Sequence, residues 1–189
     1  DQAVASGSFE GSTDLNKQGG FGSAGDINGD GFDDIIIGNR HYDPVTAEGT
    51  YTDAGGAFIW YGPISGNLDT TESTTADAVL HGASASAECG FNVSGLGDVN
   101  DDGYGDVLMQ CEGEQTAYLL HGPFDGEYGT TDAVASLPAN YRALGVGDVN
   151  GDGDIDFITG RIDDYNDVNA YLGPIDGVLS SEAADFWFN

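Results

Sequence analysis

Basic residues and long hydrophobic runs are what this sequence most clearly lacks. Four Lys and Arg oppose 33 Asp and Glu among 189 residues, which gives a formal net charge of −29 at pH 7. A protein this acidic is repelled by nucleic acid and by anionic membranes, and its self-repulsion favours surroundings that contain cations. No apolar run approaches the roughly 18 residues that a membrane-spanning helix needs. We therefore expect neither nucleic-acid binding nor membrane insertion.

Proline is also scarce, and the sequence does not begin with the pattern of a signal peptide. Five Pro accompany 31 Gly, so tight turns between short strands are expected in preference to long helices. Hydrophobic residues make up 39% of the chain, which is enough to bury a core and excludes wholesale disorder. The chain does not open on a basic segment followed by an apolar one, and we expect a secreted, extracellular or cell-surface protein whose signal has been removed. These features predict an all-β fold.

One acidic pattern occurs three times. The stretches are GDINGDGFDDIIIG at 25–38, GDVNDDGYGDVLMQ at 97–110 and GDVNGDGDIDFITG at 147–160. Each is followed by a β-branched or apolar run and then by a second apolar run that ends in Gly-Pro, at Pro63, Pro123 and Pro174. The pattern predicts a repeat with a strand entering the acidic loop, a strand leaving it, a strand ending in Gly-Pro, and an outer strand.

The repeats fill the chain as one domain, residues 1–189. Approximate boundaries are 1–66, 67–126 and 127–177, followed by an extra terminal strand in 178–189. The first repeat carries an insertion within 41–56, which we expect to form a surface loop. Two segments that resemble outer strands lie near the ends, QAVASGSF at 2–9 and AADFWFN at 183–189.

The acidic loops carry oxygen donors at the spacing that suits calcium. In D-x-N-x-D-G-x-x-D, side chains at positions 1, 3, 5 and 9 and the carbonyl at position 7 can surround one ion, and Ca²⁺ takes six to eight such oxygens. Glycine at position 6 allows the sharp turn that this requires. We expect three calcium ions per chain. The predicted ligands are Asp26, Asn28, Asp30, the carbonyl of Phe32 and Asp34; Asp98, Asn100, Asp102, the carbonyl of Tyr104 and Asp106; and Asp148, Asn150, Asp152, the carbonyl of Asp154 and Asp156.

Two alternative interpretations fit the loops less well. A solvated acidic turn explains one copy, because Asp, Asn and Gly all favour turns, but three copies with the same positions filled argue against it. An EF-hand or dockerin loop needs a bidentate acid at position 12 and flanking helices. Position 12 holds Ile37, Met109 and Thr159, and the residues that leave each loop favour strands. Magnesium fits less well than calcium, since it prefers a tight octahedron that retains water.

The two cysteines are too few for a disulfide framework. If the strands on either side of the second loop pair antiparallel, Cys89 and Cys111 lie near one another at the open end of the hairpin, where a disulfide is geometrically allowed. A pair of buried free thiols is the alternative, and the sequence leaves both open.

The repeated loops, held between strands, resemble the FG-GAP repeats of integrin α-subunit β-propellers and their bacterial relatives. Phe21-Gly22 matches the Phe-Gly of that family, whereas the later repeats have Phe91-Asn92 and Tyr141-Arg142. The resemblance implies three antiparallel propeller blades with calcium-binding hairpin loops, and it places the ligands at the positions named above. It covers nearly the whole chain.

Three blades cannot close a ring, because propellers usually contain about four to eight. The chain is then a piece of a longer propeller, or copies complete one another, or the blades form an open array. The strand-like segments 2–9 and 183–189 favour copies that exchange strands with one another. The alternative for 183–189 is that it closes the third blade within its own chain.

The sequence offers no catalytic constellation, so we expect no enzyme. His41, His81 and His121 occupy three different places in the repeat, and no G-x-S-x-G elbow is present. Aromatic residues near strand ends can either stack on a bound sugar or pack in the core, and we favour the core. Alternation in AFIWYG buries Phe58 and Trp60 on one face of the strand and leaves Ile59 on the other. The remaining aromatic candidates are Tyr61, Tyr118, Phe124, Tyr171 and Trp187.

Two functions follow from this reading. The first is a non-enzymatic, extracellular, calcium-binding repeat protein that acts as a structural or adhesive module and self-assembles through strand exchange at its ends, with other copies of itself as partners. The second is a lectin-like or integrin-like propeller fragment that binds a carbohydrate or a protein.

Overall fold

A computed structural model describes residues 9–10, 19–64, 68–69, 75–138, 141–161, 168–175 and 186–188. The strands are β1 (Phe9–Glu10), β2 (Phe21–Gly25), β3 (Asp34–Asn39), β4 (Val45–Thr46), β5 (Gly49–Thr50), β6 (Gly56–Trp60), β7 (Leu68–Asp69), β8 (Ala78–His81), β9 (Cys89–Gly97), β10 (Asp106–Cys111), β11 (Thr116–Leu120), β12 (Glu127–Gly129), β13 (Ala135–Pro138), β14 (Tyr141–Gly147), β15 (Asp156–Arg161), β16 (Val168–Tyr171) and β17 (Phe186–Phe188). This part of the chain contains no α-helix, and its 3₁₀ segments are short, such as Thr130–Asp132, which confirms the all-β prediction. None of its helical segments has the length and apolar character to cross a bilayer.

Three main sheets follow one another along the chain. Sheet I contains β2, β3, β6 and β8, sheet II contains β9, β10, β11 and β13, and sheet III contains β14, β15, β16 and β17, in that spatial order. Neighbouring strands in these four-strand sets are antiparallel, and β12 adds a parallel fifth strand beside β8. The outer strands of sheets I and II come from the sequence that leads into the next repeat.

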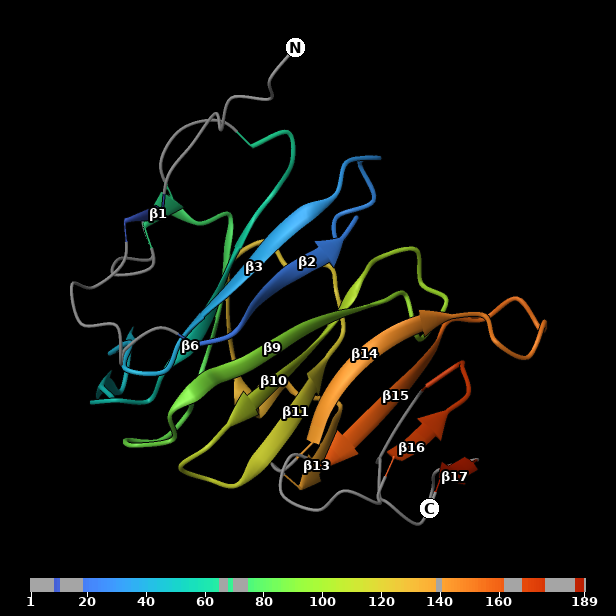
Figure 1. Ribbon diagram of the computed structural model, residues 1–189. Helices are drawn as coiled ribbons and strands as arrows, with labels where there is room; N and C mark the ends of the chain where they lie inside the picture. The colour runs from blue at the N-terminus through green and yellow to red at the C-terminus, as the bar shows by residue number, and fades with distance from the viewer. Residues whose placement is uncertain are drawn as a thin grey trace.

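The inner strands of the three sheets lie side by side. β2 lies against β9, and β9 lies against β14, as the blue, green and orange arrows in Figure 1 show. Each inner strand enters an acidic loop, so the three loops gather at one end of the three sheets. The order along the chain is therefore also the order in space.

The segments near the chain ends differ in what they do. β17 pairs antiparallel with β16, with Asn169 opposite Trp187. This part of 183–189 therefore closes sheet III within its own chain, which is the alternative to strand exchange given above for this segment. β1 pairs in parallel with β7, while residues 1–8 lie outside the described part. The insertion in the first repeat contains the small β4–β5 hairpin, where Val45 is exposed.

Apolar side chains fill the two spaces between the sheets. Between sheets I and II they form a cluster that includes Ile36, Ile59, Val93, Met109 and Leu120, and a second cluster lies between sheets II and III. Phe58 and Trp60 are buried, as alternation predicts. Ile59 on the opposite face is buried as well, because sheet II covers it.

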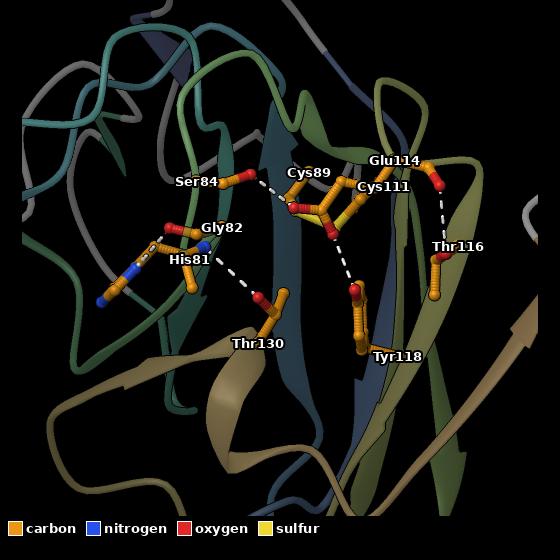
Figure 2. Close-up of a disulfide and its surroundings, with 10 residues drawn as sticks. His81, Gly82, Ser84, Cys89, Cys111, Glu114, Thr116, Tyr118 and Thr130 are labelled. Carbon is orange, nitrogen blue, oxygen red and sulfur yellow. Dashed lines mark hydrogen bonds between the residues drawn. A yellow bond between two sulfur atoms is a disulfide. The ribbon is translucent and has the colours of Figure 1, made fainter.

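A disulfide joins Cys89 to Cys111, so the bridged alternative is the one present in the structure. The two residues are register partners at the open end of the β9–β10 hairpin, and both are fully buried. Figure 2 shows Glu114 beside this bridge. Its carboxylate accepts hydrogen bonds from the Ser84 hydroxyl at 2.5 Å and from the Tyr118 hydroxyl at 2.7 Å, which ties the loop after β10 to β11 and to the chain before β9.

Candidate metal centre

Each acidic loop turns through a glycine in the left-handed region. The φ angle is 92° at Gly31 and Gly103 and 104° at Gly153, the sixth position of each loop. A side chain is strained in this conformation, so the repeated glycine has a conformational cause. The turn brings the backbone N–H groups of positions 5 and 6 within reach of the side chain at position 1.

The first-position aspartates hold the turn. Asp26 accepts the backbone N–H of Asp30 at 2.9 Å with one oxygen and that of Gly31 at 2.8 Å with the other. Asp98 makes the same pair of bonds at 3.0 and 2.7 Å, and Asp148 makes them at 3.1 and 3.0 Å. The three loops are thus copies in hydrogen bonding as well as in sequence.

Positions 3 and 5 are linked to one another. Asn28 Oδ1 accepts the N–H of Asp30 at 3.0 Å, and its amide donates to Asp30 Oδ2 at 3.0 Å. Asp30 Oδ1 in turn accepts the N–H of Phe32 at 2.9 Å. The corresponding bonds of the second and third loops join Asn100 to Asp102, Asp102 to Tyr104, Asn150 to Asp152, and Asp152 to Asp154.

The ninth-position aspartates are buried and connect the loop to the third strand. Asp34, Asp106 and Asp156 are each at most 1% exposed. Asp106 accepts the N–H of Val99 at 2.8 Å and that of Gly122 at 3.0 Å. The matching donors are Ile27 and Gly62 for Asp34, and Val149 and Gly173 for Asp156. Each of these glycines precedes the proline of Gly-Pro.

Burial shapes the electrostatics of the ninth position. The pKa of Asp106 is raised to about 7, mainly by burial. The nearby Asp102 and Asp98 carboxylates also raise this pKa, whereas the two backbone donors lower it. The pKa of Asp34 is raised for the same reasons. An ionised carboxylate at this depth gains from a nearby cation.

The second loop has one neighbour that the others lack. The Asn100 amide nitrogen lies 3.0 Å from His121 Nδ1. His41 instead contacts Asp53, and His81 Nδ1 lies 2.9 Å from the Gly82 carbonyl oxygen, so the three histidines occupy separate surroundings. Sequence reasoning did not connect His121 with the loop.

The donors in each loop have the chemistry of a calcium site, but they are turned toward the backbone. Within the part of the chain that the structure describes, no three His, Cys, Asp or Glu side chains converge closely enough to hold a metal ion. Positions 1, 5 and 9 supply carboxylates and position 3 an amide oxygen, all hard oxygen donors of the kind that calcium prefers. A carboxylate oxygen that accepts one N–H retains a second lone pair for a cation. The donor set therefore fits calcium.

Two family models match the repeats. Residues 19–60 match the model described as FG-GAP repeat, and residues 98–159 match the one described as FG-GAP-like repeat. Integrin alpha-PS2 of Drosophila melanogaster is 35% identical over 103 residues, 51% of this chain and 7% of that protein. Integrin alpha-5 of Xenopus laevis is 29% identical over 118 residues, 60% of this chain and 10% of that protein, and integrin alpha-3 of Cricetulus griseus is 32% identical over 111 residues, 56% and 10%. The chain thus spans a tenth or less of the length of these relatives.

Proposed function

Because the chain contains FG-GAP repeats similar to those of integrin α-subunits, we propose that it is an extracellular, calcium-binding adhesive or structural module. FG-GAP repeats and integrin α-subunits are non-enzymatic families, and the proposed module is not an enzyme. Its three sheets are propeller blades, and its loops bind three calcium ions through the fifteen residues given in the sequence analysis.

The observation that supports calcium binding is the threefold repetition of one loop structure. Six hydrogen bonds from equivalent donors to equivalent acceptors recur in each loop. In this arrangement the carboxylates of positions 1 and 5 lie within one tight turn, with the carboxylate of position 9 anchored at its end. Like charges held this close repel one another, and a divalent cation among them removes that repulsion. Binding at around 10⁻⁴ to 10⁻³ M is typical of extracellular calcium modules.

Isothermal titration with calcium tests this proposal. The intact chain is expected to bind three ions, and Asp98→Ala is expected to bind two. Asp101→Asn is the matched control, because Asp101 lies in the same loop, is exposed, and occupies no ligand position. An intact chain that binds fewer than three ions, or an Asp98→Ala variant that still binds as many as the intact chain, contradicts the assignment.

Self-assembly through strand exchange is the second part of the proposal. Among the strands that the structure describes, β1 pairs with the two-residue strand β7 and joins none of the three main sheets. A segment of this kind can add to an open sheet edge of another copy, since backbone hydrogen bonding there is independent of side-chain identity. Deleting residues 1–9 in the presence of calcium is expected to reduce association. Equal masses for the truncated and intact chains would argue against exchange through this strand.

An alternative function is carbohydrate or protein binding. Phe32 and Tyr104 occupy position 7 of adjacent loops and are 53% and 37% exposed. Exposed aromatic rings at equivalent positions suit stacking on a sugar or a protein side chain. Glycan binding by the intact chain that is lost in Phe32→Ala and Tyr104→Ala, with calcium affinity unchanged, would favour this function over the structural one.

A further inference from the structure

Both junctions inside the chain follow one rule of alternation along the inner strands. In β9, Val93 and Gly95 face the preceding sheet, and a Cβ added at Gly95 would lie 2.5 Å from the Ala24 carbonyl oxygen. Ser94 faces the following sheet, where its hydroxyl donates to the Ala143 carbonyl at 2.7 Å. In β14, a Cβ added at Gly145 would collide with the backbone of Leu96. Odd and even positions therefore face opposite neighbours.

The face of sheet III that points away from sheet II therefore carries residues whose equivalents in sheets I and II are buried. The second loop position is fully buried in the first two repeats, as Ile27 and Val99, but Val149 is 61% exposed. Ile36 and Leu108 are likewise buried, whereas their counterpart Ile158 is half-buried. Leu144 points to the same side as Ile158, its register partner, and is 60% exposed. This face, defined by Leu144, Val149 and Ile158, is the trailing face.

The opposite end of the array has the complementary face. Val93 and Ala143 face the preceding sheet and are 3% and 6% exposed, but Phe21 at the equivalent position in β2 is 84% exposed. Farther from the inner strand, Tyr42, Ile64 and Ala76 pack over Ile37, Phe58 and Trp60. The exposed part of this face, the leading face, is therefore centred on Phe21.

Building on the proposed self-association, we infer that the trailing face of one copy packs against the leading face of a second copy. The contact continues the junctions that already join sheets I to II and II to III, with Leu144 opposite Phe21 as Ser94 is opposite Ala143. Repeated head-to-tail contacts either close or form open filaments. Two copies supply two sets of three sheets, and the resulting six lie within the roughly four to eight blades that close a propeller.

The proposed contact between copies is less tightly packed than the contacts between sheets inside one chain, so two copies can dissociate. Gly95 and Gly145 let backbones approach closely inside the chain, but the equivalent residue in β2 is Ser23, whose hydroxyl accepts the N–H of Gly25. The larger side chains Leu144 and Phe21 hold the strands of two copies farther apart. The formal charge of −29 also opposes association, so calcium or high salt is required for it.

Sedimentation velocity of the full chain in calcium tests the inference by complementation. The intact chain is expected to form a discrete dimer as concentration rises. Phe21→Asp and Leu144→Asp each place a charge in every junction, and each is expected to be monomeric. An equimolar mixture of the two retains one unaltered junction and is expected to recover dimer. Val45→Asp is the control, because Val45 is 74% exposed and belongs to the separate β4–β5 hairpin, not to an inner strand. Val149→Asp provides a second variant of the trailing face.

Three results would overturn the inference. A dimer that survives Leu144→Asp but not Phe21→Asp would show that two leading faces meet. Dimers of both variants that dissociate on deletion of residues 1–9 would leave strand exchange as the mode of assembly. An intact chain that stays monomeric in calcium at every concentration would remove the proposed self-association itself.

Discussion

Gly95→Ala tests the close approach of sheets I and II. The added Cβ would lie 2.5 Å from the carbonyl oxygen and 2.6 Å from the Cα of Ala24, contacts that real Cβ atoms do not make. Because both atoms belong to backbone, no rotamer change relieves them and β2 has to move. Overpacking of this kind costs about 1–3 kcal/mol. The expected result is a lower free energy of unfolding by about that amount, measured by urea unfolding in saturating calcium.

Gly126→Ala is the matched control, since a Cβ at Gly126 meets nothing within 4 Å. Without strain, Gly to Ala stabilises by about 0.4–1 kcal/mol through the unfolded state, so the two substitutions are expected to have opposite signs. Ala24→Gly combined with Gly95→Ala should give no rescue, because it leaves the clashing backbone in place. Unchanged or increased stability in Gly95→Ala would refute the proposed backbone contact between the sheets.

Further outcomes are expected for two substitutions, for alkaline pH and for reduction of the disulfide. Asp106→Asn in calcium should lower the free energy of unfolding by about 1–3 kcal/mol, because one buried N–H loses its acceptor, whereas Asp101→Asn, at an exposed position, should leave it unchanged. Tyr61→Phe should cost about 1 kcal/mol by removing the hydrogen bond to the Phe124 carbonyl. Burial, together with nearby carboxylates, raises the pKa of Tyr61 to about 12, so the unfolded chain ionises first and stability of the intact protein should fall between about pH 10 and 12, a loss that Tyr61→Phe reduces. Reducing Cys89–Cys111, which closes a loop of sequence separation 22, should lower the unfolding free energy by about 3 kcal/mol in thermal or urea unfolding.

Much of the fold could be predicted from the sequence, because turns and strands depend on residues that are neighbours in the chain. The sixth-position glycines marked sharp turns, and the β-branched runs after them marked strands, because both depend on the residue and its immediate neighbours. The stacking of sheets was less readable. Ile59 is buried because another sheet covers its face, and alternation within one strand contains no information about such a neighbour.

The candidate site also has a part that the sequence predicts and a part that it does not. The types of donor at positions 1, 3, 5, 7 and 9 followed from the repeated motif, whereas the partners of position 9 did not. Asp34 binds the N–H of Gly62, 28 residues away, and the corresponding separations are 16 for Asp106 and 17 for Asp156. The repeated Gly-Pro was the signal in the sequence for these partners. Its hydrogen bond to the loop aspartate depends on the antiparallel pairing of the third strand with the second, which the motif alone does not specify.

The origin of the outer strands has a consequence for synthesis on the ribosome. Sheet I needs β8, and sheet II needs β13, each of which lies beyond the Gly-Pro that ends the third strand of its own sheet. Because a chain emerges from its amino-terminal end, neither sheet can be completed until the first part of the following repeat has emerged. The third strand of each nascent sheet, β6 or β11, therefore lacks its outer pairing partner for a time, and translation that stops at a Gly-Pro would release a product in which that strand stays unpaired on its outer side.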